Sequence, residues 1–352
     1  MRIVHATEAF EGGVIEFLRC LTNATPDIEH TIIYGRHRFY EKAKPSFPAS
    51  VKFIAWNDIE TNISPLKDIK ALNNLIKILR KEKPFDVLHL HSAKANILGR
   101  IAAKRIGQKK VIYAPHGATF LRQDVSAFTR NVFATIEKII SIFPAKIVGV
   151  SKSEAEAYHK IGMKADYVNN GKYFPQHPPK KIDDNILNIV TTGRAMQQKN
   201  PALFNEIASA FVNNSNVKFT WIGDGNQRNL LSSPNITITG WVPHTEVEKY
   251  LSEANLYIST ALWEGLSYAV LEAMSMRLPL LLSNCPGNSD LVVNSINGFL
   301  YNTPQQAIDF IHQYLNQKEL LHKHGEASLN MLQTTFNVER MADGYRKVYT
   351  SL

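Results

Sequence analysis

Glu264 and Glu272 lie eight residues apart in a segment that follows a short apolar stretch, Leu256–Ser259. The apolar stretch predicts a strand and the residues from Tyr268 onward predict a helix, which places Glu264 in the loop and Glu272 one turn into the helix. The first turn of a helix presents free backbone N–H groups and a positive dipole end, so it can hold a diphosphate without a metal ion. The alternative is that Glu264 is only a carboxylate at a helix start and Glu272 only an exposed helix residue. The spacing alone favours that alternative.

A second predicted strand, Leu187–Thr192, is followed by two cations. Gly193 and Arg194 form a turn directly after this strand, and Lys199 precedes a predicted helix. An arginine offers a bidentate fork to phosphate and a lysine offers a point charge. We expect both cations at the same edge of the sheet as the glutamates, the alternative being a surface pair at a helix start.

A third glycine turn, Gly223–Gly225, follows the predicted strand Val217–Ile222. It is not a dinucleotide-binding fingerprint, because Arg228 stands where the third glycine would be. The next strand is followed by Trp241 and Val242. Trp241 is either a core or interface aromatic or a ligand contact.

The N-terminal half offers glycines and histidines at strand ends. Gly12 and Gly13 follow the first predicted strand, where they form either a tight turn or a loop that lets backbone approach a ligand. His116 follows another strand. We expect His89 and His91, two residues apart, to lie on opposite faces of their strand, and therefore expect no metal site there.

Strands and helices alternate from end to end, which predicts two α/β domains with doubly wound parallel sheets and a cleft between them. A stretch with turn residues, three prolines and no periodicity marks the linker. We therefore predict an N-terminal domain over residues 1–168, a linker over 169–185 and a C-terminal domain over 186–336. The final helix, 337–352, is expected to pack back onto the first domain.

The predicted strands are Ile3–Ala6, His30–Tyr34, Val51–Ile54, Val87–His91, Val111–Ala114 and Ile147–Val150 in the first half, and Leu187–Thr192, Val217–Ile222, Ile236–Thr239, Leu256–Ser259, Leu280–Ser283 and Gly298–Tyr301 in the second. Two of the predicted helices are Pro65–Glu82 and Ala95–Ile106.

The net charge of +9 is concentrated in the first half, where residues 1–165 hold 26 Lys and Arg against 15 Asp and Glu. A dense part of this excess is Lys77, Arg80, Lys81, Lys83, Arg100, Lys104, Arg105, Lys109 and Lys110. These residues form either ordinary solvated helix faces or a face that meets anionic lipid or an anionic acceptor. We find no nucleic-acid-binding motif, so nucleic acid is not an expected partner.

The composition places the chain in the cytoplasm, where it could lie peripherally at the inner face of the cell membrane. We find no signal peptide and no apolar run of membrane-spanning length. The two cysteines, Cys20 and Cys285, lie one in each half and are expected to be free thiols.

The combined blocks resemble the retaining glycosyltransferases of the two-domain GT-B fold, specifically glycosyltransferase family 4. That family carries a Glu-x7-Glu motif, which here reads Glu264-Gly265-Leu266 and Leu271-Glu272-Ala273-Met274. The match continues through Leu278-Pro279-Leu280-Leu281 and Gly287-Asn288. The likeness extends over most of the chain and is strongest over residues 187–302.

The resemblance implies roles for individual residues. Glu264 would hydrogen-bond the donor sugar, Glu272 the ribose, and Arg194 and Lys199 would neutralise the leaving diphosphate. The remaining donor contacts are Gly12, Gly13, Gly193, Gly223, Trp241, Val242, Leu266, Ser267, Tyr268 and Ala269. Trp241 and Val242 would lie against the nucleobase. His116 would face the donor sugar, and His91, Ser92 and Lys94 would line the acceptor side.

The resemblance predicts a retaining hexosyl- or N-acetylhexosaminyltransferase that uses a nucleoside diphosphate sugar, with UDP as the expected nucleotide. We find no Asp-x-Asp pair and expect no metal or other cofactor. A saccharide or lipid-linked saccharide in surface polysaccharide synthesis (O-antigen, capsule or exopolysaccharide) is the expected acceptor. The rival functions are a non-catalytic sugar-nucleotide-binding subunit or sensor, a nicotinamide-dependent dehydrogenase and a sugar-nucleotide epimerase.

Overall fold

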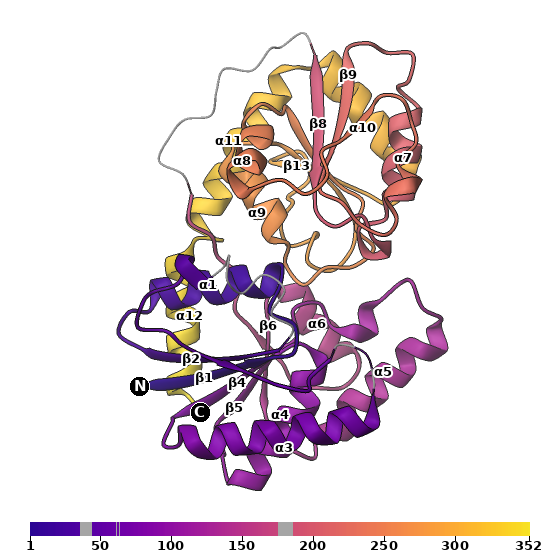
Figure 1. Cartoon of the computed structure of the whole chain (residues 1–352). Helices are drawn as coiled ribbons and strands as arrows, with labels where there is room; N and C mark the ends of the chain where they lie inside the picture. The colour runs from indigo at the N-terminus through magenta and orange to yellow at the C-terminus, as the bar shows by residue number, and fades with distance from the viewer. Residues whose placement is uncertain (36–43, 61, 63, 175–185) are drawn as a thin grey trace. The chain divides into compact units, whose positions relative to one another are not determined.

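The computed structural model describes residues 1–35, 44–60, 62, 64–174 and 186–352. Its described residues form two compact units. The first unit contains Met1–Leu121, Val125–Gly171 and the C-terminal segment Val338–Leu352, and the second contains Lys172–Asn337 together with Arg122–Asp124. Each unit is an α/β sandwich of a parallel sheet and helices (Figure 1).

The first unit is built on a seven-stranded parallel sheet of order β3-β2-β1-β4-β5-β6-β7. Its strands are β1 (Arg2–Thr7), β2 (Glu29–Tyr34), β3 (Lys52–Ala55), β4 (Val87–His91), β5 (Val111–Ala114), β6 (Lys146–Gly149) and β7 (Asp166–Tyr167). The central strands β4 and β5 are buried along their whole length, as expected for a parallel sheet that is covered on both faces.

Helices cover both faces of this sheet. They are α1 (Gly13–Ala24), α3 (Pro65–Glu82), α4 (Ala93–Ile106), α5 (Ala127–Ile140), α6 (Lys152–Lys160) and α12 (Val338–Thr350). In Figure 1, α3 and α4 lie along one face, whereas α1 and α12 lie on the other. Helix α12 is tied to the N-terminal region by an ion pair of 2.6 Å between Arg346 and Asp27.

The second unit has a six-stranded parallel sheet of order β10-β9-β8-β11-β12-β13. Its strands are β8 (Leu187–Thr192), β9 (Val217–Ile222), β10 (Ile236–Ile238), β11 (Leu256–Ser259), β12 (Leu280–Ser283) and β13 (Gly298–Tyr301). Its helices are α7 (Pro201–Ser209), α8 (His244–Ser252), α9 (Tyr268–Ser275), α10 (Pro304–Asn316) and α11 (Glu319–Thr334). Helices α7 and α10 pack together, as do α9 and α11.

In both sheets the chain starts at a central strand, adds strands on one side of it and then continues on the other side. In the first unit the reversal lies between β1 and β4, and in the second it lies between β8 and β11. The loops that leave the carboxyl ends of such a strand pair run in opposite directions, which opens a crevice for a ligand. The predicted chemistry-bearing residues follow these strands in both units.

The predicted α/β class with two doubly wound parallel sheets is confirmed. Seven of the twelve predicted strands have the observed bounds, while the five at β1, β2, β3, β6 and β10 differ by one residue at one or both ends. The short strand β7 was not predicted. The first unit extends to Gly171, three residues beyond the predicted boundary, and most of the predicted linker, 175–185, lies outside the described residues.

Gly223 forms a close backbone contact at the end of β9. Its φ is 138°, and a Cβ atom at this position would lie 2.2 Å from the carbonyl oxygen of Gly193. The loops after β8 and β9 therefore approach each other in a way that only glycine allows.

We predict that Gly223→Ala lowers the free energy of unfolding by about 3 kcal/mol, because it adds both backbone strain and a clash with Gly193. The matched control is Gly240→Ala, where φ is 70° but the added Cβ would approach nothing closer than 3.8 Å. We expect this control to cost about 1 kcal/mol. Urea unfolding measures both values, and equal losses would contradict the close contact.

Candidate functional site

An ion pair lies at the switch point of the second sheet. Lys199 Nζ donates to Glu264 Oε1 at 2.5 Å, and both side chains are largely shielded from solvent. Lys199 ends the short 3-10 helix Gln197–Lys199 after β8, and Glu264 lies in the loop after β11. Burial alone would lower the pKa of Lys199, but attraction to Glu264 outweighs it and leaves that pKa raised. The lysine is therefore charged at neutral pH.

Hydrogen bonds hold the two loops of this pair together. Thr260 Oγ1 donates to the carbonyl oxygen of Lys199 at 2.6 Å, and the Leu262 amide donates to that of Gln198 at 2.8 Å. In return, Gln198 Nε2 donates to the Trp263 carbonyl at 3.0 Å. The loops after β8 and β11 thus form one rigid frame for the lysine and the glutamate.

A third loop, after β12, packs behind Glu264. Gly287 has φ of 83°, and a Cβ atom there would lie 2.6 Å from the Gly265 carbonyl oxygen and 2.9 Å from Glu264 Cβ. The neighbouring Asn288 is fully buried, and its Nδ2 donates to both the carbonyl and the hydroxyl oxygen of Ser283 at 3.1 Å. The predicted Gly-Asn block therefore supports the position of Glu264.

Helix α9 begins at Tyr268, as predicted, at the end of the loop that carries Glu264. Its N-cap, Ser267, makes no side-chain capping hydrogen bond. Leu266, Ser267 and Tyr268 are buried, and Ala269 is half-buried. The first turn of α9 thus lies in the same loop region as the ion pair, which is the arrangement that an anion-binding helix start requires.

Glu272, one turn into α9, is held by a lysine and a histidine that the sequence did not reveal. Lys172 Nζ donates to Glu272 Oε1 at 3.1 Å, and His244 Nε2 lies 3.2 Å from the same oxygen. The hydrogen bond to Glu272 raises the pKa of His244. The alternative of Glu272 as an exposed helix residue is wrong, since its side chain is only 17% exposed.

The remaining predicted residues of the second unit lie on neighbouring loops. Gly193 follows β8 and approaches Lys199, and Arg194 is half-buried beside it. Trp241 is 65% exposed, which excludes a core role, and Val242 is half-buried.

In the first unit, the carboxyl ends of β1 and β4 are joined by Glu8, which the sequence analysis missed. This buried carboxylate accepts hydrogen bonds from Ser92 Oγ at 3.2 Å and from the amides of Lys94 and Ala95 at 3.3 and 3.1 Å. Glu8 therefore occupies the start of α4. The predicted acceptor-side Lys94 is paired with Asp68 at 2.6 Å, so part of its charge is already neutralised.

Gly12 and Gly13 are exposed at the start of α1. Gly12 has φ of 56°, and a Cβ atom added there would meet nothing within 4 Å. This glycine is therefore required by backbone conformation and not by a close contact within the described residues.

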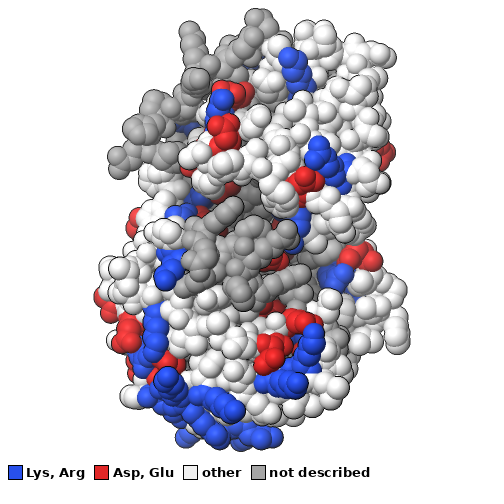
Figure 2. All heavy atoms as spheres, in the orientation of Figure 1, with Lys and Arg blue, Asp and Glu red and all other residues white. Residues whose placement is uncertain are grey.

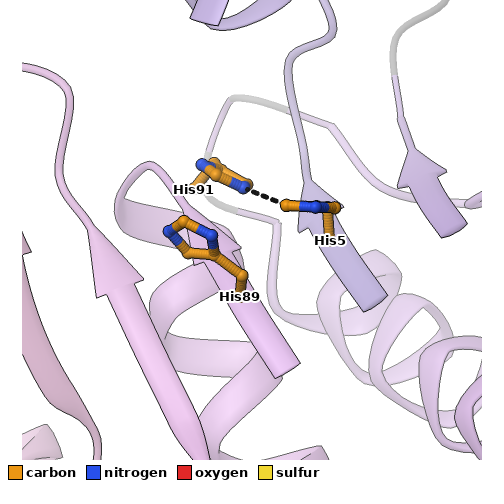
Figure 3. A group of neighbouring side chains, drawn as sticks. All are labelled: His5, His89 and His91. Atoms are coloured by element: carbon orange, nitrogen blue, oxygen red, sulfur yellow. Dashed lines mark hydrogen bonds between the residues drawn. The ribbon is translucent and has the colours of Figure 1, made fainter. Parts of the chain in front are cut away.

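The expectation that His89 and His91 lie on opposite faces of β4 was wrong. Side chains alternate along a strand, so residues two apart share a face. The ring centroids of the two histidines are 4.2 Å apart, and His5 from the neighbouring strand lies beside them (Figure 3). One ring nitrogen from each of the three lies within 4.8 Å of the others.

Burial keeps this histidine cluster neutral. It holds the pKa values of His5, His89 and His91 well below the usual range, and the neighbouring rings lower them further. Burial also lowers the pKa of His30 to about 4 and that of His116 to about 3.

His116 follows β5 in a loop that Glu154 holds in place. Glu154 Oε1 accepts hydrogen bonds from the amides of Gly117 and Ala118 at 2.7 and 3.0 Å. Ser151 also caps the start of α6, because the Glu154 amide donates to Ser151 Oγ at 3.2 Å. The sequence Ser151-Lys152-Ser153-Glu154 has the spacing of a capping box, which predicts the cap but not the hydrogen bonds from Glu154 to the His116 loop.

Comparison with protein families gives two matches. A model described as "Glycosyl transferases group 1" matches residues 187–317, and one described as "Glycosyl transferase 4-like" matches residues 39–142. The first match spans β8 to α10 and includes the Lys199–Glu264 pair.

Two curated relatives align over most of the chain. UDP-Gal:alpha-D-GlcNAc-diphosphoundecaprenol alpha-1,3-galactosyltransferase of Escherichia coli is 29% identical over 324 residues, which are 83% of this chain and 81% of the relative. N,N'-diacetylbacillosaminyl-diphospho-undecaprenol alpha-1,3-N-acetylgalactosaminyltransferase of Campylobacter jejuni is 23% identical over 327 residues, 85% of each chain.

Solved structures show the same fold. Anabaena HepE in complex with UDP-glucose has a TM-score of 0.81 at 15% identity, and the match covers 100% of both chains. Sucrose-phosphate synthase from Thermosynechococcus elongatus has a TM-score of 0.81 at 16% identity, again over 100% of both chains.

The depressed pKa values predict a loss of stability in mild acid. The folded protein keeps His30 neutral down to about pH 4, whereas the unfolded chain binds a proton near pH 6.5. Between these values the unfolded state holds more protons, so stability is full above pH 6.5 and falls as the pH decreases. For His30 alone the loss between pH 7 and pH 5 is about 2 kcal/mol.

Urea unfolding at pH 7 and pH 5 tests this expectation. His30→Gln should show a smaller loss than the wild type, while His322→Gln, which replaces an exposed histidine, should keep the wild-type dependence. The same pH dependence in both variants would contradict the assignment of His30 as a buried neutral group.

Proposed function

The chain belongs to the group 1 glycosyltransferases of the glycosyltransferase 4 type, and from this premise we propose that it moves a sugar from a nucleoside diphosphate sugar to a saccharide or lipid-linked saccharide. The proposed group is a hexosyl or N-acetylhexosaminyl unit, transferred with retention of configuration and without a metal ion. UDP is the proposed nucleotide. The proposed setting is surface polysaccharide synthesis at the cytoplasmic side of the membrane.

The observation that carries this proposal is the charged pair at the switch point of the second sheet. Lys199 and Glu264 are held by one rigid frame of hydrogen bonds, and the same loop leads into the first turn of α9. A cation and a helix start together suit a diphosphate, and a fixed carboxylate suits the hydroxyls of a sugar. A nicotinamide-dependent dehydrogenase is disfavoured on a different ground, because Arg228 stands where the third glycine of a dinucleotide-binding turn would be.

In the proposed reaction, the bond between the anomeric carbon and the diphosphate oxygen breaks as a bond to the acceptor oxygen forms. Negative charge develops on the leaving diphosphate, and Arg194, Lys199 and the α9 N–H groups would stabilise it. The leaving phosphate would accept the proton of the acceptor hydroxyl. Glu264 would orient the donor sugar, and Glu272 would bind the ribose.

The curated relatives support the choice of substrate class. The names of the E. coli and C. jejuni proteins describe transfer of galactose or N-acetylgalactosamine to sugars carried on diphosphoundecaprenol. A further relative, 22% identical over 83% of this chain, is the capsular polysaccharide glycosyltransferase CapM of Staphylococcus aureus. Lipid-linked acceptors and surface polysaccharides are therefore the setting proposed for this chain.

We predict that Arg194→Ala, Lys199→Ala and Glu264→Gln each lower the transfer rate at least about 100-fold, because each removes a group that stabilises or orients the reacting donor. Transfer from a panel of UDP-sugars to a diphosphoundecaprenol-linked sugar measures the rate. Thermal unfolding must show that each variant is folded, since removing one partner of a shielded ion pair leaves the other uncompensated.

The control for these variants is Arg228→Ala. Arg228 is a more exposed arginine in the neighbouring loop and pairs with Asp224 at 3.1 Å. We expect it to retain most of the wild-type rate. Wild-type turnover in a folded Lys199 or Glu264 variant would contradict the assigned role, and donor binding without any turnover in the wild type would favour the non-catalytic alternative.

A lipid-linked acceptor requires contact with a membrane surface, and α5 offers an apolar face for it. The exposed apolar residues on or just after this helix are Phe128, Val132, Ile136, Ile139 and Ile142. The opposite side of α5 faces the core through Glu137 and Ile140. In the described part of the chain, no helix combines the length and apolarity that a bilayer crossing needs. We therefore propose peripheral attachment through α5.

Basic residues gather at one end of the first unit (Figure 2). The exposed members of the predicted basic set lie at the ends of α3 and α4 and before β5: Lys77, Arg80, Lys81, Lys83, Lys104, Arg105, Lys109 and Lys110. Arg100 does not belong to this surface, because it is 2% exposed and donates to Asn96 Oδ1 at 2.6 Å. The proposed role of the exposed set is attraction to anionic lipid.

We predict that the protein sediments with vesicles of anionic phospholipid and that added salt weakens this binding. Replacing Phe128 and Ile139 with serine should reduce binding at least about tenfold, since both side chains are more than 60% exposed. The matched control is Val212→Ser, which removes an exposed apolar side chain from the second unit. Equal binding by both variants, or binding that ignores salt, would contradict this attachment.

A further inference from the structure

Four buried or half-buried histidines of the first unit are joined end to end by hydrogen bonds. Thr25 Oγ1 lies 2.8 Å from His30 Nε2, and His30 Nδ1 lies 3.0 Å from His5 Nε2. His5 Nδ1 lies 3.0 Å from His91 Nε2 (Figure 3), and His91 Nδ1 lies 2.9 Å from His116 Nε2. We call Thr25, His30, His5, His91 and His116 the histidine chain.

The histidine chain crosses the sheet from one strand to the next. His30 lies on β2, His5 on β1 and His91 on β4, and His116 follows β5. These strands are neighbours in the order β2-β1-β4-β5. The chain therefore connects the buried end of α1, where Thr25 lies, to the loop that carries His116.

A neutral imidazole donates through one ring nitrogen and accepts through the other. In a row of neutral imidazoles, each hydrogen bond therefore fixes the direction of the next. The low pKa values of all four rings keep them neutral at pH 7. The row has only two arrangements, with every ring protonated at Nε2 or every ring protonated at Nδ1.

Thr25 selects between these arrangements. Its hydroxyl lies 2.6 Å from the carbonyl oxygen of Leu21, which can only accept, so the single hydroxyl hydrogen points there. Thr25 Oγ1 must then accept from His30, which places the proton of His30 on Nε2. His30 Nδ1 must then accept from His5 Nε2. In the same way, His5 Nδ1 accepts from His91 Nε2, and His91 Nδ1 accepts from His116 Nε2.

We propose that Thr25 sets the tautomer of His116 through His30, His5 and His91, so that Nδ1 of His116 is a bare hydrogen-bond acceptor for a carbohydrate hydroxyl group. No residue in the described ranges hydrogen-bonds to this nitrogen. That the hydroxyl group belongs to a carbohydrate rests on the proposed function, whereas the tautomer of His116 does not. Thr25, His30, His5 and His91 are then positioning residues.

The chemistry of His116 follows from this tautomer. A nitrogen with a pKa of about 3 is a weak base at neutral pH, so it accepts a hydrogen bond without removing the proton. Such an acceptor binds the O–H of a sugar and cannot donate to a phosphate oxygen. His116 therefore favours neutral hydroxyls over the charged part of a donor.

The same polarity argues against a metal ion held by His5, His89 and His91. The Nε2 of His91 carries a proton, and the Nδ1 lone pair of His5 accepts it, so neither atom is available to a metal. His89 Nδ1 contacts Tyr349 Oη at 3.0 Å, and its Nε2 has no partner within the described residues. Metal analysis of the purified protein is a direct check.

The test is nitrogen NMR of the full chain labelled with ¹⁵N-histidine at pH 7, assigned through single His→Gln variants. We expect His30, His5, His91 and His116 all to be neutral and protonated at Nε2. Any one of them protonated at Nδ1 or at both nitrogens, or a stoichiometric metal ion lost from His91→Gln, would overturn the proposal. This readout does not depend on transfer activity.

Thr25→Val and Thr25→Ser test the anchor. Valine has nearly the same shape but no hydroxyl, so we expect His116 to populate the Nδ1-protonated form, whereas serine keeps the wild-type tautomer. In the transfer assay, Thr25→Val should lose about tenfold in kcat/KM, the worth of one hydrogen bond, and Thr25→Ser should not. An unchanged His116 tautomer in Thr25→Val would overturn Thr25 as the anchor.

The two proposals fail differently. If the tautomers are as expected but the wild type transfers no sugar, the proposed function is wrong and the histidine chain stands. If transfer is present but the tautomers are mixed in the wild type, the histidine chain is wrong.

Discussion

The ion pair between Lys199 and Glu264 holds together the loops that diverge at the switch point of the second sheet. It is largely shielded from solvent, so each charge depends on the other to offset the loss of water. The hydrogen bonds from Thr260 and Leu262 fix the backbone around it, and Gly287 lets a third loop close behind. These contacts also fix the position of the start of α9, which follows the loop of Glu264.

The two units use different physical means at their strand ends. The second unit gathers charges, with Lys199 and Glu264 at one point and Lys172 and Glu272 at another. The first unit buries a hydrogen-bonded row of neutral imidazoles, and His116 is the last member of this row. Charges suit the phosphates and ribose of a nucleotide, while a neutral acceptor suits the hydroxyls of a carbohydrate.

Much of the fold could be predicted because the strands are short apolar runs between clear turn signals. Strand β11 and the start of α9 have their predicted bounds, and these two elements place Glu264 and Glu272. Strand β7 was missed because two exposed residues, Asp166 and Tyr167, carry no pattern. In the site, Lys199 and Glu264 could be placed at the same sheet edge because each lies in the loop between a predicted strand and the next helix.

The missed residues act over long sequence separations or through roles that a local motif hides. Lys172 lies 100 residues before its partner Glu272, so no local pattern connects them. Glu154 has the sequence spacing of a capping-box partner of Ser151, yet its carboxylate also holds the loop of His116. The cluster of His89 and His91 could have been found from the period of a strand, had the alternation been applied correctly.

The central claim is that the donor nucleotide binds the second unit at the frame built by Lys199 and Glu264. Hydrogen exchange of the full chain with and without saturating UDP, and then GDP, tests it most directly, because exchange reports each segment separately. The account predicts slower exchange over residues 193–200 and 266–271 with one of the two nucleotides. Protection confined to other segments, or no change in these two with either nucleotide, would contradict it.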